Sequence, residues 1–166
     1  MTQRILRFGG DMRVAIGCDH AGFPLKDVAI EAVLAAGHEP IDLGTNSPTS
    51  VDYADYAEKV GKTIQQGDAL RGILICGSGV GICIAAGKMK GIYPAICHDT
   101  YSAHQGVEHD NMNVLCIGGR VIGPELAREI ITTFVNSRFI GNDKGEERHK
   151  RRVEKVRKIE DNISQL

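Results

Sequence analysis

A cysteine followed by alternating glycines is the feature of this sequence best suited to chemistry. Residues 72–81 read GILICGSGVG, an apolar run that ends at Cys76 and continues into Gly77, Ser78, Gly79, Val80 and Gly81. Glycines let the backbone turn tightly and approach a ligand, and a helix predicted over 82–89 would direct free N–H groups and its positive end to the same place. Such a site favours anions and favours a thiolate, so Cys76 is a candidate base or nucleophile. An ordinary buried cysteine beside a structural turn is an equally good interpretation of this motif alone.

A second polar cluster follows the first apolar run of the chain. Residues 13–17 (RVAIG) predict a buried strand, and Asp19 and His20 come directly after it. In parallel α/β sheets, sites lie at this carboxyl edge of the strands. The alternative is that Asp19 caps the next helix while His20 lies on the surface.

Three further candidates are more ambiguous. Tyr53 follows a turn-rich loop over 44–50 and either bonds a ligand or covers the core, and composition favours the core. Arg148 and Arg152 are four residues apart, so on a helix they point the same way and can grip a phosphate. The usual interpretation of such a charged run is a solvated face.

Composition narrows the class of protein. The chain has 166 residues, with 20 basic and 21 acidic side chains, which indicates one domain and no electrostatic footprint for nucleic acid or membranes. Five cysteines without a CxxC pair are typical of reduced thiols, and no apolar stretch approaches the ~20 residues that span a bilayer. We therefore expect a cytoplasmic protein whose partners are small molecules or copies of itself.

The elements that position these residues alternate along the chain. Strands are predicted at 13–17, 39–43, 73–75, 93–97 and 114–117, with helices between them and an amphipathic helix over 124–137. Five alternations predict an α/β fold with a five-stranded parallel sheet in three layers. Residues 1–11 are expected to be an extension, 12–140 the α/β domain, and 141–166 a charged C-terminal helix of that domain.

The C-terminal helix keeps a narrow apolar stripe within its charges. Val153, Val156, Ile159 and Ile163 recur at helical spacing. This stripe needs a covering surface, which either a neighbouring subunit or the chain's own domain supplies.

Two functional classes compete at this point. A dinucleotide-binding or regulatory module needs GxGxxG after the first strand and an acidic residue ~20 positions later. Asp42 is suitably placed, but the first strand is followed by GCDHAG, which lacks the middle glycine. An enzyme acting on a small anionic substrate accounts better for Cys76, His20, His109 and the paired arginines.

Several motifs together resemble the family of type B ribose-5-phosphate isomerases and galactose-6-phosphate isomerases. They are GCDHAGFPLK, VDYADYA, ILICGSGVGICIAAGK, CHDTYSA, the histidine before NVL, GGRVIG and RHKRRVE, in this order over about 12–161. The resemblance implies a Rossmann-like sheet of order 2-1-3-5-4 and an aldose–ketose isomerase that uses no metal or other cofactor. It also implies a homodimer or homotetramer with sites between subunits.

The resemblance also implies roles for individual residues. Cys76 matches the base that moves a proton between sugar C2 and C1 through a cis-enediolate, and His109 matches the residue that opens the sugar ring. Asp19 and Tyr53 match sugar contacts, and Gly77 to Gly81 supply N–H donors. The phosphate end is matched by His20, Arg148 and Arg152, and Arg120 matches another site arginine. Some members carry a glutamate base where this chain has Ile82, which leaves the task to Cys76.

One position departs from the family pattern. Asparagine usually follows the ring-opening histidine, whereas this chain has Asp110 and then Asn111. A carboxylate accepts but cannot donate, and it adds negative charge near an enediolate. Asp110 either binds a hydroxyl of another sugar or turns away while Asn111 replaces it. Ser78, where threonine is common, is a milder change. The alternatives to ribose 5-phosphate are therefore a tetrose 4-phosphate, allose or galactose 6-phosphate, or a uronate.

Overall fold

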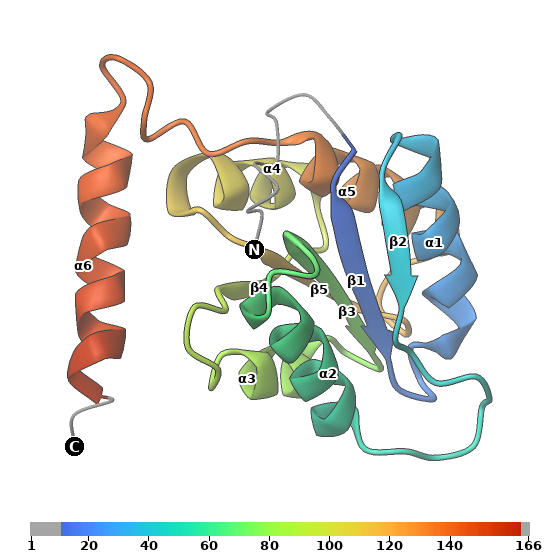
Figure 1. Ribbon diagram of the computed structural model, residues 1–166. Helices are drawn as coiled ribbons and strands as arrows, with labels where there is room; N and C mark the ends of the chain where they lie inside the picture. The colour runs from blue at the N-terminus through green and yellow to red at the C-terminus, as the bar shows by residue number, and fades with distance from the viewer. Residues whose placement is uncertain (1–10, 164–166) are drawn as a thin grey trace.

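The computed structural model describes residues 11–163, which form a five-stranded parallel sheet with helices on both faces (Figure 1). The strand order is β2-β1-β3-β5-β4, which confirms the order that the family resemblance implied. The strands are β1 (Arg13–Cys18), β2 (Glu39–Asp42), β3 (Arg71–Cys76), β4 (Pro94–Ile96) and β5 (Val114–Gly118).

Within residues 11–163, six α-helices and one short 3-10 helix accompany the strands. They are η1 (Phe23–Leu25), α1 (Lys26–Ala35), α2 (Tyr53–Gln65), α3 (Val80–Ala86), α4 (Thr100–Asp110), α5 (Pro124–Asn136) and α6 (Glu147–Ile163). None of the helices within residues 11–163 has the length and apolar content needed to cross a membrane.

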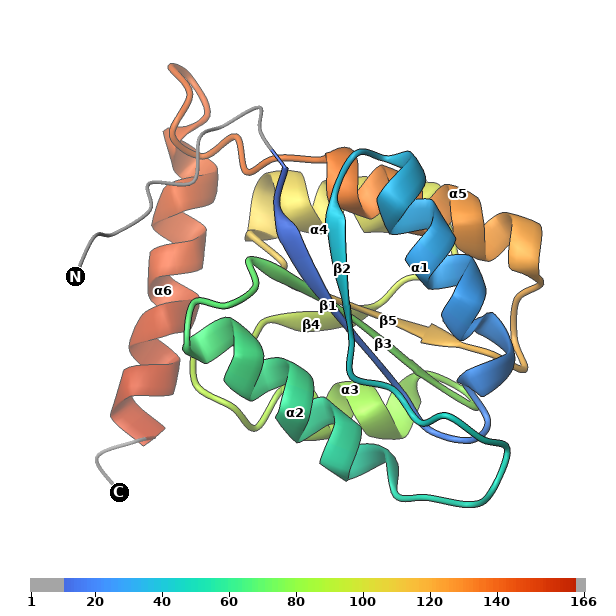
Figure 2. The ribbon, with the colours of Figure 1, turned by 45° about the vertical axis from the view of Figure 1, so that its right-hand side comes forward.

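The three central strands, β1, β3 and β5, bury side chains on both faces, as their continuous apolar runs predicted. Ile73 and Ile75 of β3 pack with α1, α4 and α5, whereas Leu74 and Cys76 pack with α2 and α3. Figure 2 shows these two helical layers on opposite sides of the sheet. Because side chains alternate along a strand, this register places Cys76 on the face that α2 and α3 cover.

Three helix boundaries differ clearly from the predicted ones. The charged C-terminal helix was expected over 141–166, but α6 begins only at Glu147, because residues 141–145 form turns and a bend. The helix after the glycine run was expected over 82–89 and instead spans Val80–Ala86, because Gly79, at φ 80°, ends the turn two residues earlier. Helix α3 ends at Ala86, because residues 87–91 form turns and a bend rather than a further helical turn. In α2, Asp52 is extended and occupies the N-cap, so the helix begins at Tyr53 rather than near Asp55.

Helix α6 stands at one side of the sheet and contacts its own domain at two places (Figures 1 and 2). Near its start, His149 and Val153 are buried. Near its end, the Glu160 carboxylate accepts hydrogen bonds from the Gly91 N–H at 2.9 Å and the Tyr93 hydroxyl at 3.1 Å. Part of the apolar stripe therefore packs on the same chain.

The middle of that stripe is not covered. Val156 and Ile159 are 51% and 62% exposed. The expected need for a further covering surface therefore holds for this part of α6 only.

Candidate functional site

Cys76 ends β3 at the carboxyl edge of the sheet, where the glycine run turns the chain into α3. Its side chain is 4% exposed, and the Gly79 N–H donates to its Sγ at 3.2 Å. The Cys76 sulfur is therefore buried beneath a backbone donor, at the point where the glycine run begins.

The glycines of this turn are required by close approaches. Gly79 adopts φ 80°, and a Cβ there would lie 3.0 Å from the Ile117 carbonyl carbon. A Cβ at Gly81 would lie 2.7 Å from the ring of Tyr53. Tyr53 thus lies over the first turn of α3 and is 44% exposed, so the composition-based expectation that it covers the core was wrong.

Arg120 belongs to the same end of the molecule as Cys76. Its backbone N–H donates to the Gly77 carbonyl at 3.0 Å, and the Gly119 N–H donates to the Cys76 carbonyl at 2.8 Å. Its Nη1 lies 3.6 Å from the position of a Cβ on Gly77. The turn after β5 therefore brings one guanidinium beside the glycine run, with Ser78 and Val80 at the exposed rim of the turn.

Asp19 and His20 shape the neighbouring loops. The buried Asp19 carboxylate accepts from the N–H groups of Ala21 and Gly22, each at 2.9 Å, so it holds the turn after β1. Nδ1 of His20 accepts from the Val51 N–H at 3.2 Å, which leaves the proton of a neutral ring on Nε2. Both residues lie at the carboxyl edge, as predicted.

Lys26 is a structural residue that the sequence patterns did not reveal. Its buried ammonium lies 3.0 Å from the Asp42 carboxylate and donates at 2.8 Å to both the Thr45 carbonyl and the Asn46 side chain. These contacts anchor the loop over 44–50. The ion pair with Lys26 also occupies the Asp42 carboxylate, which a dinucleotide site at this position would need for binding a ribose.

The other cysteines differ from Cys76 in their surroundings. Burial raises the pKa of Cys18 and of Cys97 to about 11, which keeps both as thiols. A hydrogen bond with the Cys116 thiol lowers the pKa of Cys83 to about 7, although Cys83 is half-buried in α3. Sequence reasoning missed the lowered pKa of Cys83, because the contact that causes it joins α3 to β5.

His109 lies at the other end of the molecule from Cys76. It is in the last turn of α4, which covers the opposite face of the sheet, and the chain then enters β5 at its amino edge. Gly72 pairs with Val114 there, and the four steps from Gly72 to Cys76 span about 13 Å. The structure therefore does not bring Cys76 and His109 together within one chain.

Helix α6 adds its cations at this second end. The His149 ring stacks on His109 with centroids 4.0 Å apart and an interplanar angle of 18°. Burial, followed by the neighbouring His109, lowers the pKa of His149, which favours a neutral ring. Arg148 lies 2.8 Å from the Glu146 carboxylate, and Arg152 is exposed.

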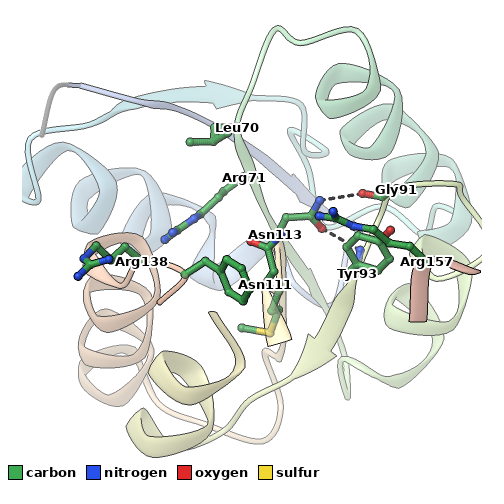
Figure 3. A pocket seen from close by; sticks show the side chains of 10 residues that line it. Leu70, Arg71, Gly91, Tyr93, Asn111, Asn113, Arg138 and Arg157 are labelled. Atoms are coloured by element: carbon green, nitrogen blue, oxygen red, sulfur yellow. Dashed lines mark hydrogen bonds between the residues drawn. The ribbon is translucent and has the colours of Figure 1, made fainter. Parts of the chain in front are cut away.

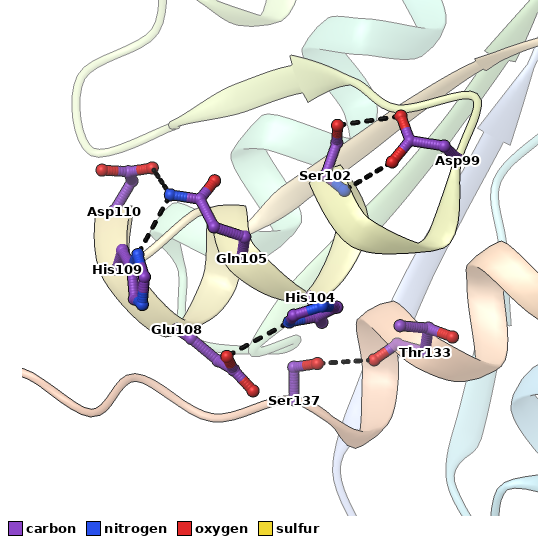
Figure 4. A network of polar contacts seen from close by, with 9 residues as sticks. All are labelled: Asp99, Ser102, His104, Gln105, Glu108, His109, Asp110, Thr133 and Ser137. Carbon is purple, nitrogen blue, oxygen red and sulfur yellow. Dashed lines mark hydrogen bonds and ion pairs between the residues drawn. The ribbon is translucent and has the colours of Figure 1, made fainter.

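Asp110 and the residues around it form a small polar network on α4 (Figure 4). The Gln105 amide nitrogen lies 3.1 Å from Nδ1 of His109 and 3.4 Å from Oδ2 of Asp110. Asn111 adopts φ 54° and ends the helix. In this chain, the unusual aspartate is therefore engaged by a neighbouring glutamine.

A cavity of about 400 Å³ opens between the amino edge of the sheet and α6 (Figure 3). Three arginines line it, but Arg71 donates to the Phe134, Val135 and Ser137 carbonyls at the end of α5, and Arg138 pairs with Asp143 at 2.6 Å. The third, Arg157, hydrogen-bonds with the Tyr93 side chain, so each of these cations already has a protein partner. The cavity lies away from Cys76, so we do not assign the chemistry to it.

Within residues 11–163, no group of three or more His, Cys, Asp and Glu side chains is arranged to hold a metal ion.

Comparisons with a family model and with individual known proteins point to the same family. The model of the ribose/galactose isomerase family matches residues 14–156. Ribose-5-phosphate isomerase B of Escherichia coli is 42% identical over 148 residues, which cover 89% of this chain and 96% of that protein. The D-erythrulose-4-phosphate isomerase of Pectobacterium atrosepticum is 41% identical over 132 residues, covering 78% of this chain and 86% of the relative.

The fold comparison agrees. The type B ribose 5-phosphate isomerase structure from Trypanosoma cruzi superposes with a TM-score of 0.86 at 42% sequence identity, covering 92% of this chain and 98% of that one. The similarity thus extends over the sheet and both groups of candidate residues.

Proposed function

The chain belongs to the ribose/galactose isomerase family and is a sugar-phosphate isomerase, and we propose that it interconverts ribose 5-phosphate and ribulose 5-phosphate. The observation that carries the mechanism is the Cys76 sulfur held under the Gly79 N–H at the carboxyl edge of the sheet. The substrate's anionic end and the developing enediolate both suit a site built from backbone donors.

Cys76 acts as the base in this proposal. Its thiolate takes the proton from C2 of the open aldose, which leaves a cis-enediolate. The hydroxyl proton of O2 passes to O1, and the thiol returns its proton to C1 to give the ketose. The N–H groups of the turn over 77–81 stabilise the charge on the enediolate oxygens. Asp19 and Tyr53, at the same edge, contact the sugar.

His109 acts from a second copy of the chain. Its distance from Cys76 within one chain prevents both from reaching one sugar, whereas a twofold dimer brings the His109 end of one copy to the Cys76 end of the other. There His109 assists ring opening through the ring and anomeric oxygens, beside Asp110. The uncovered Val156 and Ile159 on α6 support such an assembly.

The phosphate is bound where the two copies meet. His20 and Arg120 come with Cys76, and Arg148 and Arg152 come with His109 from the second copy. Guanidinium groups bind phosphate oxygens in pairs, which suits two arginines on one helix face. In this proposed homodimer, each site needs residues from both copies, so a single chain has no complete site.

A substrate screen tests the proposal. Purified protein is assayed for isomerisation of ribose 5-phosphate, erythrose 4-phosphate, allose 6-phosphate, galactose 6-phosphate and an unphosphorylated uronate. We expect the highest kcat/KM with ribose 5-phosphate. A higher value with another sugar assigns the substrate to that sugar and overturns the pentose assignment.

A tetrose 4-phosphate is the second candidate. It rests on Asp110 in place of the family's asparagine and on the relative of 41% identity whose name specifies D-erythrulose 4-phosphate. The erythrose 4-phosphate arm of the screen separates the two candidates.

A further inference from the structure

Gln105 makes an unusual pair of contacts one helical turn before His109. Its single amide nitrogen lies 3.1 Å from the Nδ1 atom of His109 and 3.4 Å from the Asp110 carboxylate (Figure 4). An amide nitrogen carries two hydrogens, so it can donate one to each partner. One side chain thus links the unusual aspartate to the imidazole.

The aspartate determines which way the glutamine amide faces. If the amide were reversed, its oxygen would face the Asp110 carboxylate, and two acceptors would oppose each other without a hydrogen between them. The nitrogen therefore faces Asp110, and the same nitrogen then faces His109. The Asp110 carboxylate thus sets the orientation of the Gln105 amide, and through it the atom that faces His109.

That orientation determines the tautomer of His109. Because Gln105 donates to Nδ1, this nitrogen has to accept, and the proton of a neutral imidazole is carried by Nε2. The His149 ring lies flat against His109 at 4.0 Å and restricts its rotation. Stacking on His149 thus fixes the plane of the His109 ring, and the hydrogen bond from Gln105 fixes its tautomer.

We propose that Gln105 is a positioning residue that fixes His109 as the Nε2–H tautomer, and that Asp110 fixes Gln105 in turn. This inference rests on the role proposed above for His109. The Nε2–H group donates a hydrogen bond to the ring oxygen as the sugar opens, while one proton passes from the anomeric hydroxyl to that oxygen through water. The imidazole keeps its own proton, so the enzyme's protonation is unchanged after opening.

Nuclear magnetic resonance of ¹⁵N-labelled histidine tests the tautomer without using activity. The full-length protein is studied at about pH 8, where imidazoles are neutral, and His109→Asn identifies the signal. We expect Nε2 to be protonated in the unaltered chain and both tautomers to be populated in Gln105→Leu and in Asp110→Asn. Gln105→Glu, whose carboxylate only accepts, is expected to move the proton to Nδ1. A proton on Nδ1 in the unaltered chain overturns the proposal.

A pair of substrates then tests the consequence for ring opening. Ribose 5-phosphate closes into a furanose, but erythrose 4-phosphate cannot, because its O4 carries the phosphate. Gln105→Leu is expected to lower kcat/KM for the pentose by about tenfold, as the loss of one hydrogen bond predicts, and to leave the tetrose unaffected. Equal losses on both substrates, or a tautomer change without a change in their ratio, overturn the positioning role.

The matched control is Glu108→Gln. Glu108 pairs with His104 at 3.1 Å on the same helix and has no contact with the Gln105 amide. It should leave the tautomer and the substrate ratio unchanged, and a change as large as that of Gln105→Leu overturns the specific role of Gln105. If neither substrate is isomerised by the unaltered protein, the proposed function fails, while the magnetic resonance result still decides the tautomer.

Discussion

The two ends of the molecule are built in different ways. At the carboxyl edge, Cys76 is 4% exposed and receives a backbone N–H, and the Asp19 carboxylate is satisfied by two more. At the other end, His109 is contacted by side chains from α4 and α6, and Asp110 and Arg152 are exposed. The first end is shaped by backbone donors of the chain, whereas the second is held by side-chain contacts on α4 and α6.

Removing the sulfur should have the largest effect. Cys76→Ala is expected to lower kcat by up to about ten-thousandfold, because general-base catalysis is lost while the buried site tolerates a smaller side chain. Exchange of the substrate C2 hydrogen with deuterated solvent measures the step directly.

Cys83→Ala is the matched control for that experiment. The hydrogen bond with Cys116 lowers the pKa of Cys83 to about 7, so Cys83 is the natural competitor for the role of base. It is expected to retain most of the exchange rate. Exchange that persists in Cys76→Ala and disappears in Cys83→Ala would transfer the role to Cys83.

Mixing two inactive variants should restore part of the isomerase activity. Cys76→Ala and His109→Ala subunits that exchange freely form half of all dimers as mixed dimers, and each of these has one intact site. We expect about a quarter of the unaltered activity, since one site in two is restored in one dimer in two. Mixed dimers verified by mass spectrometry that remain inactive would place the whole site within one chain.

The arginines of α6 should have a smaller, substrate-dependent effect. Arg148→Ala or Arg152→Ala is expected to raise KM by roughly ten- to a hundredfold, the range for one charge-assisted hydrogen bond. Arg151→Ala is the control, because Arg151 is exposed on the same helix turn and has no assigned role. Equal changes in all three variants would indicate a general effect of charge on α6.

Much of the first end was predictable from local patterns. Apolar runs identified five strands, and the rule that sites lie at the carboxyl edge placed Asp19, His20 and Cys76 together. The early start of α3 was missed because Gly79 is the N-cap of the helix. The residue type alone does not distinguish a capping glycine from a loop glycine. Lys26 was missed because a buried lysine is recognised only by partners from distant positions.

The second end was predictable mainly through resemblance. Local patterns indicated that His109 is chemically interesting, but not that α4 carries it to the opposite edge of the sheet. The contact of Gln105 with His109 depends on the orientation of an amide, which residue types alone do not determine. The stacking of His149 on His109 likewise depends on where α6 returns to its own domain.

The smallest expected effect is on the stability of the folded chain at acidic pH, and it comes from His149 at the second end of the molecule. The pKa of the buried His149 is lowered from its ordinary 6.5, so the unfolded chain binds a proton at higher pH than the folded chain does. Stability should therefore fall as pH drops below about 6.5, and this loss is absent at higher pH, where both states are neutral.

His149→Phe keeps a flat ring against His109 but cannot titrate. We expect its thermal unfolding midpoint to decline less between about pH 7.5 and pH 5.5 than that of the unaltered chain, by a few degrees at most. The pKa of His38 is also lowered, by burial and by Arg71, and it contributes the same slope to both proteins, so their difference isolates His149. Identical pH dependence in the two proteins would mean that α6 separates from α4 or accommodates the imidazolium, and the second end would then be looser than the stacked rings indicate.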